Sequence, residues 1–553
     1  MHRMKRVMTC AAVCTCTVAT TLGAQDTPPS AWARGSDVNG ASSSGSVSWL
    51  GAWSPLRPIV DLPRGLLRAP LAPGVLDAPS PMAGAFVLGG APGALARDLM
   101  PRIAGDTSSF GELRFKSANE SGVYHRPLDV TESHVTSVSG LGWSPVGARG
   151  IAIGRFVIDR EYNAISSFAE RLTPYVSSPF IATDSVRPPM QRTRARLEGA
   201  LGLRLGEFGV GLSASLDSRE HNSVDFPLRR TGRASTPAVM TGIERTLPWF
   251  GLRIGGYYRW SEPNETNLLN ATPSATVIYG LQGYDEPFGY AVGSNSPVFV
   301  RVDRRATALG GSAELTVMRT RVVVMHEKGD RAEDQYRSIT SAVRPTETWR
   351  ASGSESRAMA QRLFGTRVRA TVVASIESLD GDAVRSDLKG IAVKGSDEKS
   401  AIEGDVRVSF AKAWSAAVIG GATHVLTTRT DYVAAIGSHI DATTPFGGVE
   451  LARKVGRASV AVGATASATS PSGALPSSAR DPNYRRLIAP ALAYDAASAR
   501  AWSTWFTATT PMSAAVLLVS VRAEHTSPTA VVTSRLQPGG ERTAWSVTVG
   551  LRP

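Results

Sequence analysis

The residue types that most often carry catalysis or bind metals are scattered along this 553-residue chain. Its histidines show no metal-ligand spacing such as His-Glu-x-x-His, in which two imidazoles share one helix face. His221, His326 and His424 could lie at a rim beside a Ser or Asp, as a hydrolase would need, but no matching motif accompanies them. We therefore predict no catalytic residue, no metal site and no cofactor, and expect that the protein is not an enzyme.

Two other kinds of residue are interpreted without invoking catalysis. Asp217, Asp330 and Asp431 fall near predicted strand ends, where solvated loops or contacts to bridging cations would explain them. The glycine-rich piece 199–211 has no helix after it, and a phosphate cradle would need the amino end of a helix there. The glycines are therefore assigned to strand packing.

The polar pattern that could have a chemical role is a set of arginines spaced two residues apart, which in strands share one face. Arginine rings line anion-selective pores, so the set predicts an anion-leaning interior and a possible small anionic solute. The alternative is neutralisation by Glu198, Glu314, Glu377 and Glu403. The candidate residues are Arg192, Arg194, Arg196, Arg204, Arg253, Arg259, Arg367 and Arg369.

The stretch 191–219 shows the element that would position these arginines. From Thr193 to Leu205 all the charges fall on even positions and the apolar residues on odd ones. Gly206-Glu207 follows as a two-residue turn, and the alternation resumes from Phe208. A helix is the alternative, because leucines also recur every four residues, but five glycines cost about 1 kcal/mol each in a helix. A period of two with a tight turn predicts an antiparallel hairpin.

The same alternation persists from residue 109 to the end of the chain, and its connections are of two kinds. Short turns are predicted near 145–148, 206–207, 247–249, 319–320, 364–366, 411–413, 454–456 and 510–512. Between them lie long polar connections, at 118–131, 161–188, 222–235, 263–303, 331–354, 379–399, 428–442, 469–496 and 526–540. Counting one strand between each pair of successive connections gives about 18 strands, within a range of 16–20. Short turns alternating with long loops are typical of a barrel with periplasmic turns and extracellular loops.

The composition of the two faces favours lipid over water outside this barrel. A soluble β-sandwich also alternates, but its outer face carries many charges into water. Here the face opposite the apolar one is rich in Gly, Ser, Thr and Ala with interspersed ion pairs, which suits a lumen. Aromatic residues beside the short turns predict a girdle at head-group depth. They are Trp143, Phe208, Trp249, Phe250, Phe364, Phe410 and Trp414. A closed all-β antiparallel transmembrane barrel over 109–553 follows, and closure removes the sheet edges.

The first 108 residues read differently. Residues 1–24 have a basic start, an apolar run and a small-residue cleavage site, as a signal peptide does. All three cysteines lie in this leader, so disulfides would be absent; a lipoprotein is the alternative, without a convincing lipobox. Residues 25–108 are rich in Pro and Gly, which predicts a periplasmic or lumen-plugging segment, or a linker. No apolar run after residue 24 reaches the length of a transmembrane helix.

The charge balance agrees with an extracytoplasmic barrel. The formal net charge is +13, of which the leader contributes three basic residues. Solvated loops explain the excess, and so does attraction to anionic solutes or lipid head groups. No pattern indicates nucleic-acid binding.

The segments SSFGELRFKSANESGVYHRPLDV (108–130) and GRFVIDREYN (154–163) resemble an uncharacterised family of large outer-membrane barrels. The resemblance implies the bacterial outer membrane as location, with its lipid and lipopolysaccharide as partners. The expected function is a passive channel or transporter for an unidentified solute. The alternative is a non-conducting structural, assembly or surface-binding barrel that recruits a protein or cell-surface polymer through its loops. A secreted soluble all-β protein ranks third.

Overall fold

The computed structural model describes most of the chain from Phe110 onward. The signal peptide 1–24 and the segment 25–108 lie outside the described residues, so both stay predictions. Among the residues described, no helix is long and apolar enough to cross a lipid bilayer. The ranges are 110–124, 132–147, 150–165, 181–183, 189–223, 228–247, 249, 251–271, 276–281, 287–292, 298–318, 320–338, 345–365, 367–411, 413–474, 489–513, 515–529 and 540–552.

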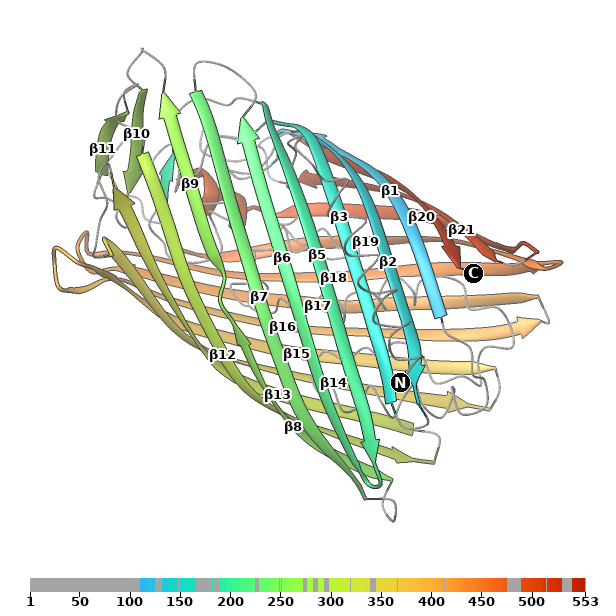
Figure 1. Ribbon diagram of the computed structural model, residues 1–553. Helices are drawn as coiled ribbons and strands as arrows, with labels where there is room; N and C mark the ends of the chain where they lie inside the picture. The colour runs from blue at the N-terminus through green and yellow to red at the C-terminus, as the bar shows by residue number, and fades with distance from the viewer. Residues whose placement is uncertain are drawn as a thin grey trace.

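One antiparallel sheet closes on itself (Figure 1). Each strand pairs with its neighbours in sequence, and the first strand pairs with the last, for example Phe115 with Val549. The predicted closed barrel is therefore confirmed. The first strands are β1 (Phe110–Gly122), β2 (Glu132–Val146), β3 (Gly150–Ile165), β5 (Pro189–Leu205), β6 (Phe208–Ser223) and β7 (Leu228–Leu247). Then come β8 (Leu252–Ser261), β9 (Asn264–Ala271), β12 (Val298–Val317), β13 (Thr320–Ser338), β14 (Glu347–Phe364) and β15 (Val368–Arg385). The wall ends with β16 (Gly390–Ala411), β17 (Trp414–Asp431), β18 (Ile436–Val455), β19 (Ala458–Ala474), β20 (Ala499–Pro511), β21 (Val516–Pro528) and β22 (Arg542–Arg552).

The barrel has 18 strand positions, as the count from sequence predicted. The sheet contains 19 strands, but β8 and β9 follow one another along a single position, since both pair with β7 and with β12. The interruption falls at Glu262-Pro263, where proline has no amide to donate to a ladder. The backbone oxygen of Pro263 still accepts a bond of 2.9 Å from the Arg304 amide. The wall is thus continuous across the break.

All eight short connections lie within about three residues of the predicted turns, and all are at one end of the barrel. The turn after β5 is Gly206-Glu207, with Gly206 at a φ of 65°, a left-handed conformation that favours glycine. The predicted hairpin 193–216 is confirmed as β5 and β6, paired from Leu205–Phe208 up to Met190–Ser223. Because the same end holds the start of β1 and the end of β22, the described chain enters and leaves the barrel there.

At the other end, several connections predicted as long loops are wrong. Most of 222–235, 331–354, 379–399 and 428–442 is strand, and β15 and β16 are joined by only 386–389. Their outward faces are mostly polar, and polarity was taken as a sign of loops. On the inner face of β15 and β16, however, Leu379, Ala383 and Val393 form a buried apolar cluster with Trp349. A ladder of backbone hydrogen bonds does not need an apolar outer face, so the strands continue beyond the apolar zone.

Small elements outside the wall lie at this long-connection end. β4 (Ile181–Thr183), β10 (Thr276–Leu281) and β11 (Pro287–Val292) form a separate three-stranded sheet. The helix α5 (Ala489–Asp495) precedes β20, and the Tyr494 ring lies 4.7 Å from that of Tyr124, which follows β1. The interval 263–303 thus contains β9 and a hairpin, as well as the start of β12.

Candidate functional site

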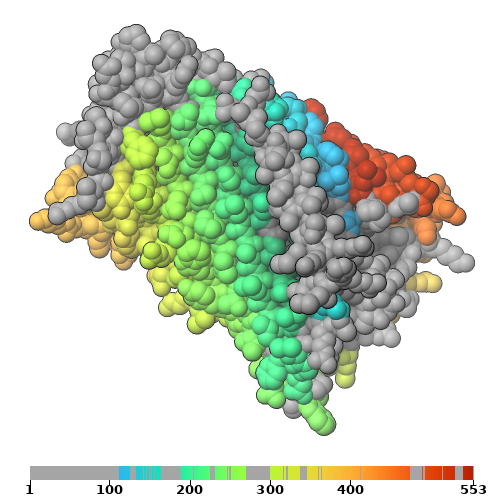
Figure 2. Space-filling model, viewed as in Figure 1, coloured from blue at the N-terminus to red at the C-terminus, as the bar shows by residue number. Residues whose placement is uncertain are grey.

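Over about nine residues from the short turns, the outer face of most strands is largely apolar, apart from arginines at the rim. On β15 the outward positions run from Val368 to Ile376 without a charge, and then continue through Ser378, Asp380 and Asp382. Nine residues of a strand tilted by about 40° span roughly 23 Å, close to the apolar band of an outer-membrane barrel. We call this zone the apolar belt. Figure 2 shows the wall over β5–β8 as an unbroken surface of side chains.

Aromatic side chains mark both edges of the belt. Beside the short turns Phe208, Trp249, Phe364 and Phe410 are exposed, as predicted for a girdle. Three outward arginines accompany this rim: Arg245 lies 5.5 Å from the ring centroid of Phe208, Arg362 4.9 Å from Phe364, and Arg453 4.9 Å from Trp414. A second row was missed in the sequence: Trp260 on β8, Trp502 on β20 and Trp545 on β22, seven to nine residues further along. These tryptophans were missed because they lie far from any predicted turn.

The inner face carries the predicted arginines, most of them beside carboxylates. Arg194 is buried, and its Nε lies 2.6 Å from Oδ1 of Asp217, which also accepts a bond of 3.0 Å from Arg219. Arg192 lies 3.7 Å from Glu161. Arg196 is also buried, in register with Asp217. Asp217 is therefore a buried strand residue between arginines and not a solvated loop residue.

The other predicted arginines are distributed around the wall. Arg253 lies 3.6 Å from Glu314, a partner that the neutralisation hypothesis had named. Arg259 bonds Glu327, which also accepts a bond of 3.0 Å from the hydroxyl of Tyr257. Arg369 on β15 is buried, in register with Arg407.

Two candidates stand apart from these pairs. Arg367 is exposed in the turn before β15, and the side chain of Arg204 lies outside the described part of the chain. Since β5, β8 and β15 are separated by other strands, the candidates form several local clusters and not one ring. The partners Asp217, Glu161 and Glu327 could not be singled out beforehand, because cross-strand register is not visible in the sequence.

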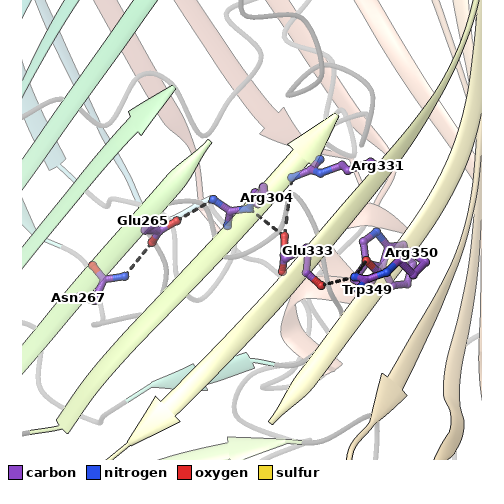
Figure 3. A network of polar contacts seen from close by, with 7 residues as sticks. All are labelled: Glu265, Asn267, Arg304, Arg331, Glu333, Trp349 and Arg350. Atoms are coloured by element: carbon purple, nitrogen blue, oxygen red, sulfur yellow. Dashed lines mark hydrogen bonds and ion pairs between the residues drawn. The ribbon is translucent and has the colours of Figure 1, made fainter. Parts of the chain in front are cut away.

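The most developed polar cluster lies on the inner face above the belt, across β9, β12, β13 and β14 (Figure 3). Arg304 is central: its Nε lies 2.8 Å from Glu333 and its Nη1 3.1 Å from Glu265. Asn267 donates a bond of 2.8 Å to the other oxygen of Glu265, and Arg331 lies 3.8 Å from Glu333. Burial opposes the charge on Arg304, but the two carboxylates outweigh it and raise the pKa of the guanidinium. The contacts of Arg304 link three strand positions.

His221, on the inner face of β6 above the belt, is buried beside Arg192, its cross-strand partner. Space for its ring is left by Gly232, where a Cβ would lie 2.4 Å from Nε2 of His221. Burial, with a smaller contribution from Arg192, lowers the pKa of His221 to about 3. The imidazole is thus neutral in the folded barrel, which suits packing more than proton transfer near neutral pH.

The burial of neutral His221 predicts that the barrel loses stability in acid, and that the His221→Gln variant loses less. Between about pH 6.5 and pH 3 the unfolded chain protonates His221 and the folded barrel does not, so stability falls as the pH falls. The contribution is at most about 1.4 kcal/mol per pH unit. Urea unfolding midpoints at pH 7 and pH 4.5 would measure it. An equal drop in both proteins would contradict it.

The other acids and histidines singled out in the sequence have structural positions. Asp431 accepts 2.9 Å bonds from the amides of Val433 and Ala434 and so caps the turn before β18. His326 bonds Ser356 at 2.8 Å, and His424 lies 3.3 Å from Asp441, all on the outer face. No group of three or more His, Cys, Asp or Glu side chains that could hold a metal ion occurs within the described ranges.

An 18-stranded closed wall with an apolar belt outside and ion pairs inside defines a transmembrane β-barrel protein of the outer-membrane type. The chain belongs to the family of unknown function DUF6850, whose profile matches residues 103–552. This confirms the resemblance to an uncharacterised family of large barrels. No curated protein matches the sequence.

Solved structures with a similar fold are distant. A mutant of the ferric enterobactin receptor PfeA from Pseudomonas aeruginosa is 8% identical, with a TM-score of 0.38 and 80% of each chain covered. A FadL homologue from the same species is 9% identical, with a TM-score of 0.31 over 88% of this chain and 96% of that one. CdiB from Acinetobacter baumannii is 6% identical, with a TM-score of 0.32 over 79% of this chain and only 60% of CdiB. None of these likenesses goes beyond the barrel fold.

Proposed function

We propose that this protein resides in the bacterial outer membrane and acts as a passive channel or transporter for a polar solute. The observation that carries the proposal is the contrast between the two faces of one wall. The outer face of β15 and β16 presents only apolar or small residues through the belt, while the inner face carries Arg369, Asp405 and Arg407 at the same level. A polar inner wall favours water, and a barrel of 16–18 strands encloses a bore wide enough for an aqueous path.

The paired charges also bear on selectivity. An anion-leaning lumen was one expectation, based on eight arginines. Because Arg194, Arg253 and Arg259 each lie against a carboxylate, the geometry favours the alternative, a lumen in which positive and negative charge balance locally. A lumen of this kind presents dipoles to a solute and discriminates weakly between anions and cations.

Planar-bilayer recording tests both statements. The purified wild-type barrel is expected to conduct, with a reversal potential close to zero in a salt gradient. Asp217→Asn removes the carboxylate between Arg194 and Arg219 and is expected to shift the reversal potential toward anions. The matched control is Asp303→Asn, which removes the partner of Arg301 on the outer face and is expected to change nothing.

Two results would contradict the proposal. Absence of conductance from a correctly folded barrel would favour the structural or surface-binding alternative. Strong ion selectivity in the wild type, unaffected by Asp217→Asn, would mean that residues other than these pairs control the path.

A further inference from the structure

The outer face of β2, β3 and β5 carries a group of polar and aromatic side chains that the channel function does not use. The guanidinium of Arg160 lies 4.8 Å from the ring centroid of Tyr162, and the ring of His134 lies 6.4 Å from Tyr162 on the neighbouring strand. Thr136 and Thr193 are the cross-strand partners of Arg160 on either side. We call these five residues the Arg160 patch.

The patch lies at a defined depth. On β3 the outward positions from the short turn upward are Ala152, Gly154, Phe156 and Ile158, so Arg160 is the first outward polar residue beyond the apolar belt. Residues at this level meet the phosphate and sugar layer of a bilayer, where amphipathic rings and long basic side chains are favoured. The Tyr162 ring beside Arg160 fits that layer.

Three other outward arginines at this end, unlike Arg160, are paired with carboxylates. Arg233 lies 3.1 Å from Glu220, Arg301 2.6 Å from Asp303, and Arg350 2.7 Å from Asp334. By contrast, no carboxylate in the described part of the chain lies within ion-pair distance of Arg160. Glu220 is opposite Thr193 in register, but it pairs with Arg233. Arg160 is therefore exposed, positively charged and uncompensated by the described wall.

We propose that the Arg160 patch binds the phosphate group of an anionic lipid in the outer leaflet. A planar guanidinium can direct two parallel N–H bonds at phosphate oxygens while its face stays against an aromatic ring. The hydroxyl of Thr193 flanks it and can donate to the same group, while that of Thr136 donates to the backbone oxygen of Arg160, 3.4 Å away. The acyl chains of the lipid would then lie along Phe156 and Ile158, directly below. The proposal rests on the membrane placement given above.

Native mass spectrometry of the full chain in detergent tests it, with phosphatidic acid and phosphatidylcholine as probes. The wild type is expected to retain phosphatidic acid in preference. Arg160→Gln is expected to weaken that retention about five-fold, the effect of one basic residue near an anionic surface. Arg233→Gln is the matched control, because it removes an exposed but ion-paired arginine three strands away, and it is expected to bind like the wild type.

The other possible outcomes would each contradict one part of the proposal. Equal retention by Arg160→Gln and the wild type, or equal losses in Arg160→Gln and Arg233→Gln, would show that the Arg160 patch is not the lipid-binding site. Displacement of the lipid by an equal concentration of inorganic phosphate would overturn the lipid as occupant. Gel migration of unheated samples reports separately whether the barrel is folded. If the folded chain stays soluble without detergent, the membrane placement is wrong, whatever the lipid results.

Discussion

Replacing Arg304 by Met is expected to destabilise the barrel by about 3–5 kcal/mol, because it leaves Glu265 and Glu333 buried without their shared cation. All three side chains are at most 7% exposed, so water cannot replace the lost partner easily. Methionine keeps an unbranched side chain that fills most of the space of the arginine stem, which limits the effect of an added cavity. Equilibrium unfolding in urea, followed by tryptophan fluorescence, would measure the change.

The control for this substitution is on the same strand. Arg301, three residues away on the opposite face, forms an ion pair with Asp303, but its side chain is 57% exposed. Exposed pairs contribute about 0–1 kcal/mol, so Arg301→Met should change stability little. If both variants lower the free energy of unfolding equally, the cluster in Figure 3 is hydrated in solution and does not stabilise the barrel wall.

The second large effect is expected from a charge placed in the belt. Val372 is at the middle of the apolar stretch of β15 and faces outward. If hydrocarbon covers that face, Val372→Arg costs about 2–4 kcal/mol at mid-bilayer. Unfolding of the barrel reconstituted in lipid vesicles measures this cost, with the wild type as reference.

A second position on the same strand provides the control for Val372→Arg. Asp380→Arg places the same charge on the same face of β15, eight residues further on, beyond the belt. A cost close to zero is expected there, since charged side chains near the interface are tolerated. Equal costs at both positions would show that lipid depth does not distinguish them, and the assignment of the belt would then be wrong.

Sequence patterning predicted the closed barrel because alternation is a local property of each strand. A run such as Val368–Ile376 reveals its period without knowledge of any neighbour, and a turn such as Gly206-Glu207 needs only its own residues. These two signals were enough to locate the eight short turns and 18 strand positions.

The same reasoning failed where the signal was not local. Segments such as Ser378–Arg385 are strands because backbone ladders continue above the lipid, although no apolar outer face marks them. The partner of an arginine depends on register across strands: Arg194 meets Asp217, 23 residues later, and Arg304 joins Glu265 to Glu333. Likewise, Trp260, Trp502 and Trp545 become a row only after the strands are aligned.

The extension of β15 and β16 past the belt has a practical consequence. About nine residues of β15 lie beyond Ile376, so the connection 386–389 stands roughly 20 Å clear of the lipid on two hydrogen-bonded strands. A peptide tag inserted there would be displayed on a stiff stalk, within reach of an antibody on intact cells, and its labelling would report the orientation of the barrel directly.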